Sequence, residues 1–149
     1  MDPYPYRNSL LILLFVYLII MLRLVLFKDL DGIIAYTNKL TSYKDAFSAA
    51  FERSNFIPFK TFYYYFSLQE KWQTGFENIG GNIIIFIPLG IILTIIFNKK
   101  SKSLFAVFFI SAFLETLQLL ITYGNFDIDD IILNMIGGWV GFIIVNKLK

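Results

Sequence analysis

Apolar residues fall into four long runs along the chain, separated by segments rich in polar and charged residues. The runs cover about residues 9–27, 79–97, 103–123 and 130–145. A helix needs about 20 residues to cross the hydrocarbon core of a bilayer, and the runs have or approach that length. The pattern therefore predicts an all-α membrane protein, one domain over residues 1–149, built as a bundle of about four transmembrane helices.

The segment between the first two runs, residues 28–78, has a different pattern. Apolar side chains recur at helical spacing within residues 38–53, at Leu40, Tyr43, Phe47, Ala50 and Phe51. Ser42 followed by Asp45 is typical of a capping box that begins such a helix. Aromatic residues then crowd into residues 59–66, and rings with polar tips collect at the headgroup level of a bilayer. We expect an amphipathic, interfacial helical segment here, which could also form a hood over a lipid-facing pocket.

The distribution of lysine and arginine among the loops predicts the orientation of the protein in the membrane. The turn at residues 98–102 carries three lysines, whereas the acidic turn at residues 124–129 carries none. In a bundle of four helices, Arg7 and the C-terminal lysines fall on the same side as the lysine turn. Because basic residues are enriched in cytoplasmic loops, we predict a multi-pass protein of the plasma membrane with both termini in the cytoplasm. The acidic turn and the interfacial segment then face outward.

The amino-acid composition mainly excludes certain classes of protein and of catalytic site. Hydrophobic residues make up 57% and charged residues 16% of the 149 residues, which is more apolar than a soluble domain of this size. The chain has no histidine and no cysteine, which excludes Ser-His-Asp triads, thiolate nucleophiles and iron–sulfur clusters. A net charge of +2 is too small for a nucleic-acid footprint. We expect no cofactor, no bound metal and no nucleic-acid partner.

Polar side chains interrupt the predicted transmembrane helices at similar depths. Glu115 and Gln118 share one face of the third helix, about 13 Å and 9 Å below its outer end. Asp130 and Asn134 are one turn apart on the fourth helix, and Asn82 lies in the outer half of the second. A charged side chain at such a depth costs about 2.5–3.5 kcal/mol on insertion, so it needs a partner or a wet cavity. We therefore infer an outward-opening polar pocket.

Arg23 is the only base inside the four runs and is the best candidate counter-ion for Glu115. Together with the acidic rim, the predicted ligand-binding residues are Arg23, Asn82, Glu115, Gln118, Asp127, Asp130 and Asn134. Alternatively, these side chains only form the interhelical hydrogen bonds that hold the bundle together. Gly137 and Gly141 form a GxxxG pair, which is typical of closely packed transmembrane helices.

Several short elements resemble, in order, the VanZ-like family. Residues 55–59 resemble its Asn-Leu-Ile-Pro-Phe element, and residues 78–90 resemble its block that begins Asn-x-x-x-Asn and ends Phe-x-Pro-Leu-Gly. The pair Glu115 and Gln118, followed by the aspartates of residues 126–130 and by Asn134, resembles its C-terminal signature. The chain departs from the pattern after Gln118, because many members carry an arginine before the aspartates and this chain has none there.

The resemblance implies a small protein of the bacterial cell membrane, of the type linked to resistance against lipoglycopeptides such as teicoplanin. The favoured function is an envelope protein that binds a membrane lipid, a lipid-linked cell-wall precursor or the lipoglycopeptide itself in its outer pocket. This function requires no catalytic residue, and none is assigned. The sequence does not specify the oligomeric state.

Two other function classes stay open. A membrane enzyme could act on a lipid-linked envelope substrate, with Mg²⁺ or Mn²⁺ held by Glu115, Asp127, Asp129 and Asp130. A small transporter would need a continuous polar path. The predicted cytoplasmic halves of the last three helices carry only Thr94 as a polar side chain, which disfavours transport of a hydrophilic solute.

The Arg23–Glu115 pair can be tested by a double-mutant cycle. If Arg23 neutralises Glu115, Arg23→Leu should lower the unfolding temperature, because it leaves a carboxylate without its counter-ion in the membrane. Adding Glu115→Gln should then recover part of the loss, with a coupling of about 0.5–3 kcal/mol. Thermal unfolding of the purified variants measures this, and a double variant equal to the sum of its singles would exclude the pair.

Overall fold

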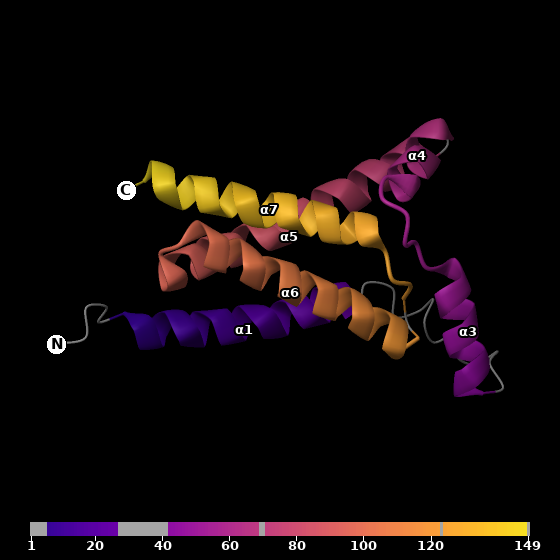
Figure 1. The fold of residues 1–149 in the computed structure, drawn as a ribbon, viewed down its shortest axis with the longest axis horizontal. Coiled ribbons are helices and arrows are strands. Elements are labelled where there is room, and N and C mark those ends of the chain that lie inside the picture. The colour runs from indigo at the N-terminus through magenta and orange to yellow at the C-terminus, as the bar shows by residue number, and fades with distance from the viewer. Residues whose placement is uncertain (1–5, 27–41, 69–70, 123, 149) are drawn as a thin grey trace.

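The computed structural model of this protein is a bundle of long helices with two short helices at one end (Figure 1). It describes residues 6–26, 42–68, 71–122 and 124–148, and every structural statement below concerns these residues. The long helices are α1 (Arg7–Leu26), α5 (Trp72–Phe97), α6 (Lys100–Leu120) and α7 (Ile128–Lys147). The short ones are α3 (Tyr43–Arg53) and α4 (Lys60–Ser67). The expected all-α fold is confirmed.

All four long helices are long and apolar enough to cross a membrane, in agreement with the four predicted spans. The largest shift is in α5, which begins at Trp72 rather than at the expected residue 79. Its first two turns are polar and lie against α4, where a Cβ added at Gly75 would be only 2.8 Å from Cβ of Tyr65. Hydropathy detects the apolar part of this helix and misses its polar extension.

The short helices occupy the segment that was predicted to be interfacial. Residues 43–53 of the predicted helix over 38–53 form α3, while residues 38–41 lie outside the described residues. Ser42 begins α3 as predicted, because its hydroxyl accepts a hydrogen bond from the backbone N–H of Asp45 at 3.2 Å.

The two ends of the bundle differ. The start of α1 and the end of α7 lie together at one end, and α3 and α4 lie at the other, which we call the α3–α4 end (Figure 1). The lysine turn between α5 and α6 shares the end of the termini. This arrangement is the one that the orientation argument requires. The side of the membrane that each end faces stays a prediction.

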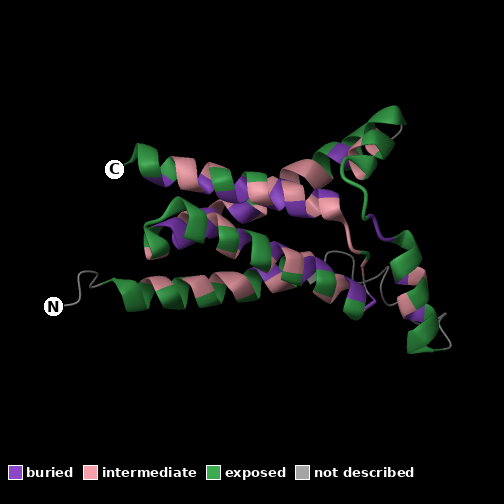
Figure 2. Ribbon diagram, viewed as in Figure 1, coloured by how far each residue is buried: buried purple, intermediate pink, exposed green. Residues whose placement is uncertain are grey.

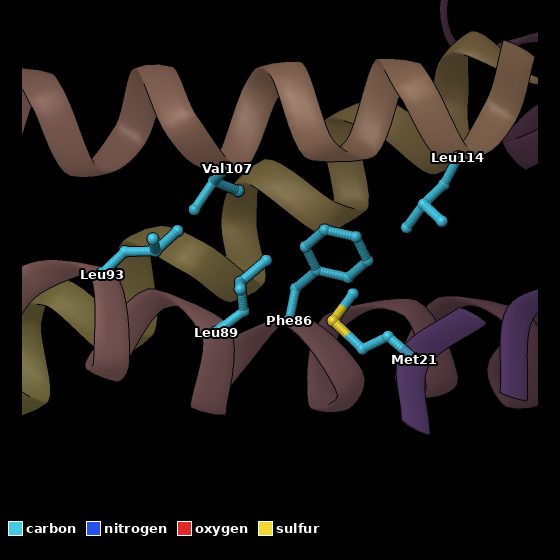
Figure 3. Packing of buried hydrophobic residues seen from close by; sticks show 6 residues of the cluster. All are labelled: Met21, Phe86, Leu89, Leu93, Val107 and Leu114. Atoms are coloured by element: carbon cyan, nitrogen blue, oxygen red, sulfur yellow. The ribbon is translucent and has the colours of Figure 1, made fainter. Parts of the chain in front are cut away.

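The apolar core lies between α1, α5 and α6, and Figure 3 shows its six buried side chains: Met21, Phe86, Leu89, Leu93, Val107 and Leu114. The outer faces of α1 and α6 stay exposed (Figure 2), with large apolar side chains such as Phe105, Phe109 and Phe113. A soluble monomer rarely exposes so much contiguous apolar surface, whereas a bilayer covers it with acyl chains. The exposed surface is therefore that of a multi-pass membrane protein.

Glycines let α5 and α7 approach each other backbone to backbone. A Cβ added at Gly137 would lie 2.3 Å from the carbonyl oxygen of Ile83, and one at Gly141 would lie 2.4 Å from that of Ile87. Gly90 of α5 makes a similar approach to α7, at 2.3 Å. These distances leave no room for a side chain. The close packing predicted for the GxxxG pair is confirmed.

The segment between α3 and α4 is joined to the start of α7 by a short parallel bridge. The backbone N–H of Asn55 donates to the carbonyl of Phe126 at 2.7 Å, and Ile128 N–H donates to the carbonyl of Asn55 at 2.9 Å. The Asn55 amide also donates to Asp127 at 2.9 Å and to Asp129 at 3.3 Å. Backbone and side chain of one asparagine therefore fix the two short helices to the bundle.

Asp129 of α7 caps the start of α4. Its carboxylate is 1% exposed and accepts hydrogen bonds from the backbone N–H groups of Phe59 and Thr61, the latter at 2.8 Å. The first turn of α4 has no acidic residue of its own, so a carboxylate from another helix satisfies its free N–H groups. Phe59 has a φ of 67°, which bulky residues rarely adopt, and its bond to Asp129 holds this conformation.

The glycine contact predicts the effect of adding a single methyl group. Gly137→Ala should destabilise the bundle by about 1–3 kcal/mol, because the Cβ can fit only if α5 and α7 move apart. Gly80→Ala is the matched control, since a Cβ there meets nothing within 4 Å. Thermal unfolding in detergent measures both, and equal unfolding temperatures for the two variants would contradict this packing.

The cap on α4 predicts a second effect. Asp129→Asn should free the start of α4 at a cost of about 1.5–3 kcal/mol, because it weakens hydrogen bonds to a buried charged group. Tryptic cleavage after Lys60 should accelerate. Asp45→Asn removes an exposed capping carboxylate on α3 and serves as the control. If both variants were cleaved at Lys60 at the wild-type rate, Asp129 would not hold α4.

Candidate functional site

A cavity of about 410 Å³ lies inside the bundle, toward the α3–α4 end, and we call it the inner cavity. Five helices contribute its lining, which consists of Leu24, Val25, Tyr65, Thr74, Glu77, Asn78, Gly81, Asn82, Ile85, Glu115, Gln118, Asp130 and Asn134. Five of the seven predicted site residues are among them: Asn82, Glu115, Gln118, Asp130 and Asn134. Residues predicted from their depth in separate helices therefore share one cavity.

The other two predicted residues lie elsewhere. Asp127 lines a neighbouring cavity, and Arg23 is exposed on α1, although the next two residues, Leu24 and Val25, line the inner cavity. Glu115 is 3% exposed and accepts a hydrogen bond from the backbone N–H of Asp127 at 3.0 Å. This bond gives Glu115 a donor from the α6–α7 turn, and the ion pair with Arg23 stays a prediction.

Some polar side chains of the inner cavity also connect helices. The amide of Gln118 on α6 donates to the carbonyl of Val25 on α1 at 3.1 Å. The amide nitrogen of Asn134 on α7 donates to the hydroxyl of Ser111 on α6 at 2.9 Å. The alternative interpretation of these residues, as interhelical hydrogen bonds, therefore holds for part of the set.

Asn134 has a second polar atom that this interpretation does not explain. Its residue is 3% exposed, and its Oδ1 has no hydrogen-bond partner among the described residues. A buried acceptor without a donor costs about 1–3 kcal/mol, and such atoms in proteins are usually paired with water or a ligand. Because Asn134 lines the inner cavity, a donor inside that cavity would satisfy it.

A second cavity, of about 310 Å³, lies nearer the short helices, and we call it the end cavity. Its lining consists of Arg53, Asn55, Lys60, Thr61, Tyr64, Tyr65, Asn78, Asn125, Phe126, Asp127 and Asp130. Tyr65, Asn78 and Asp130 line both cavities and form their common wall.

Tyr65 brings α4 into this common wall. Gly75 of α5 leaves room for its Cβ, so the ring can reach the site from a helix outside the bundle. Burial raises the pKa of the Tyr65 phenol, and the negative charges of Asp130 and Asp127 raise it further. The hydroxyl therefore stays protonated at neutral pH and can donate a hydrogen bond in either cavity.

The aspartates of the α6–α7 turn do not gather into a metal site. Asp127 accepts hydrogen bonds from Asn55 and from the hydroxyl of Thr61, the latter at 2.6 Å, while Asp129 caps α4. Within the described parts of the chain, no group of three or more His, Cys, Asp or Glu side chains is placed to hold a metal ion. Glu115 and the three aspartates, the candidate ligands for Mg²⁺ or Mn²⁺, are therefore not brought together as one group.

Sequence reasoning did not assign Asn55, Thr61, Tyr65, Arg53 or Lys60 to the site. Asn55 stands in the element that resembles the VanZ-like family, so that motif was the available signal. The others come from the two short helices, whose placement over the bundle depends on contacts distant in sequence.

Comparison with protein-family models gives a match to VanZ/LLP1 over residues 14–149, nearly the whole chain. The matched region includes every residue that lines the two cavities. Comparisons with curated proteins and with solved structures give no match. The family resemblance of the short motifs is confirmed, and the chain belongs to the VanZ/LLP1 family.

Proposed function

We propose that this protein binds the polar head group of an envelope amphiphile in the inner cavity and thereby contributes to lipoglycopeptide resistance of the teicoplanin type. The ligand is a membrane lipid, a lipid-linked cell-wall precursor or the lipoglycopeptide. The observation that carries the proposal is the buried Oδ1 of Asn134, which lines the inner cavity and lacks a donor among the described residues.

The chemistry of the lining defines the kind of ligand. Glu77 and Asp130 are acceptors when ionised, so the bound group should supply hydroxyl or ammonium donors. Leu24, Val25 and Ile85 add apolar surface for the non-polar part of an amphiphile. A volume of about 410 Å³ lies at the lower end of the range for small-molecule pockets. It suits a head group, and a lipoglycopeptide could enter only in part.

The proposed orientation places the α3–α4 end outside a bacterial cell and both termini in the cytoplasm. The lysine turn supports this, since Lys99, Lys100 and Lys102 lie at the opposite end of the bundle, beside the termini. An envelope ligand would then reach the inner cavity from the outer leaflet. The exposed aromatic residues of α3 and α4 suit the headgroup region there.

The half of the bundle away from the α3–α4 end is tightly packed, which supports a binding function rather than transport. Phe86, Leu89, Leu93 and Val107 are buried together between the helices, and glycine contacts bring α5 and α7 together at the same level. The polar residues of the inner cavity therefore give way to a packed apolar core. A hydrophilic solute would need to cross that core.

Asn134→Leu tests the proposal. It removes the buried acceptor and should weaken ligand binding by about 5- to 150-fold, the equivalent of about 1–3 kcal/mol. Resistance of cells that express the variant should fall to the level of cells without the protein. The minimal inhibitory concentration of teicoplanin measures resistance, and mass spectrometry of the purified protein measures co-purified lipid.

Ser111→Ala is the matched control, because it breaks the same Asn134–Ser111 hydrogen bond and leaves Oδ1 of Asn134 in place. This control should keep its resistance and its lipid. Since Oδ1 has no hydrogen-bond partner among the described residues, Asn134→Leu should be at least as stable to heat as Ser111→Ala. Equal resistance and equal lipid content in the two variants would refute the proposed function.

A further inference from the structure

We infer that the end cavity is an anion subsite, which holds the phosphate of the same ligand whose donor groups occupy the inner cavity. The ligand class is then a phospholipid-type amphiphile with an ammonium or hydroxyl-bearing head group. This inference rests on the proposed function of the inner cavity and adds a second recognition element to it.

The first argument is the continuity of the two cavities. Tyr65, Asn78 and Asp130 line both, so the two cavities adjoin at these residues, and groups bound in them would lie on either side of one shared wall. The phenol of Tyr65 can serve either group as a donor. A ligand with two polar parts could therefore place one part in each cavity.

The second argument is the separation of charge. Among the described lining residues, the inner cavity has the acids Glu77 and Asp130 facing it together with Glu115 and has no base, whereas the end cavity has Arg53 and Lys60 beside Asp127 and Asp130. The guanidinium of Arg53, at the end of α3, is held near this cavity by a hydrogen bond from Nε to Asn125 Oδ1 at 3.0 Å. Positive ammonium and negative phosphate groups would each face the opposite charge.

The position of Lys60 supports the same reading. It is the first residue of α4, where the partial positive charge of the helix start disfavours a base. A lysine at this position gains nothing from the helix itself. An anion in the end cavity would supply the favourable interaction.

The end cavity also contains two acids, Asp127 and Asp130, which differ in their surroundings. The carboxylate of Asp127 already accepts hydrogen bonds from Asn55, from Thr61 and from the backbone N–H of Asp129. Asp130 belongs to the wall shared with the inner cavity, where a donor group of the ligand would face it. Arg53 and Lys60 are the bases of this lining, and neither belongs to the wall shared with the inner cavity.

Tyr64 adds a neutral donor. Its hydroxyl accepts a hydrogen bond from the ammonium of Lys71 at 2.6 Å, which directs its own proton toward another acceptor. Tyr64 lines the end cavity, so a phosphate oxygen there could accept that proton. Two cations and two phenols, Tyr64 and Tyr65, then surround the proposed anion.

Titration of the full-length protein with defined lipids tests the subsite. The protein in non-ionic detergent is titrated with phosphatidylethanolamine and with a phosphate-free digalactosyl lipid of the same acyl chains, and native mass spectrometry counts bound lipid. The wild type should bind the phospholipid about tenfold more tightly, as expected for charge-assisted hydrogen bonds to phosphate. The double variant Arg53→Gln/Lys60→Gln should lose this preference and keep its affinity for the galactolipid.

Lys44→Gln is the matched control, since it removes an exposed lysine of α3 that lines neither cavity. It should keep the preference, and Arg53→Lys should keep most of it because the charge remains. Unchanged unfolding temperatures establish that each variant folds. A double variant that still prefers the phospholipid as the wild type does would overturn the subsite.

Two further measurements separate this inference from the proposed function. Asn134→Leu should lower the affinity for both lipids by the same factor, because Asn134 contacts the donor groups of the head group and not the phosphate. If Asn134→Leu left both affinities unchanged while Arg53→Gln/Lys60→Gln lost the preference for the phospholipid, the proposed function would fail. The end cavity alone would then bind phosphate. Displacement of the phospholipid by millimolar inorganic phosphate would assign the subsite to free phosphate and overturn the lipid assignment.

Discussion

A carboxylate or amide buried among transmembrane helices must find a hydrogen-bond partner, because hydrocarbon offers none. This requirement organises the α3–α4 end. Glu115 takes its donor from the backbone at Asp127, and Asp129 takes two from the start of α4. The bonds to Asp129 join residues 70 and 68 positions apart, whereas the bond to Glu115 ties α6 to the turn that follows it. The acids thus pull a surface segment onto the bundle, and they create the walls of both cavities as they do so.

The inner cavity begins where the glycine contacts end. Gly137 packs directly on the backbone at Ile83, and the next polar residues toward the α3–α4 end are Asn134 on α7 and Asn82 on α5. From Gly137 toward the end of the bundle that holds the start of α1 and the end of α7, the two helices touch backbone to backbone. Toward the α3–α4 end, a Cβ added at Gly80 or Gly81 of α5 would meet nothing within 4 Å, so the close backbone contact is lost there. The same two helices therefore provide a rigid base and an open, polar upper half.

Depth along a helix can be read from the sequence, whereas rotation about its axis is set by packing. Asn82, Glu115 and Asn134 were placed in one cavity because each depth depends only on the rise per residue. Arg23 and Leu24 lie at almost the same depth but point about 100° apart, and only Leu24 lines the cavity. A hood over a pocket was one of two interpretations of the segment that contains α4, and the structure shows that α4 contributes Tyr65 to the walls of both cavities. Its attachment through Asn55 and Asp129 depends on tertiary contacts that no local pattern specifies.

The aspartates of the α6–α7 turn show why such a cluster is a weak indicator of a metal. Asp127 caps α7 through the backbone N–H of Asp129, Asp129 caps α4, and Asp130 faces the cavities. Two helix starts meet at this turn, and each presents N–H groups that attract a carboxylate. Fold formation therefore uses two of the three acids. The charge left to act on a ligand comes from Asp130 together with Glu77, which lie beside the basic residues Arg53 and Lys60.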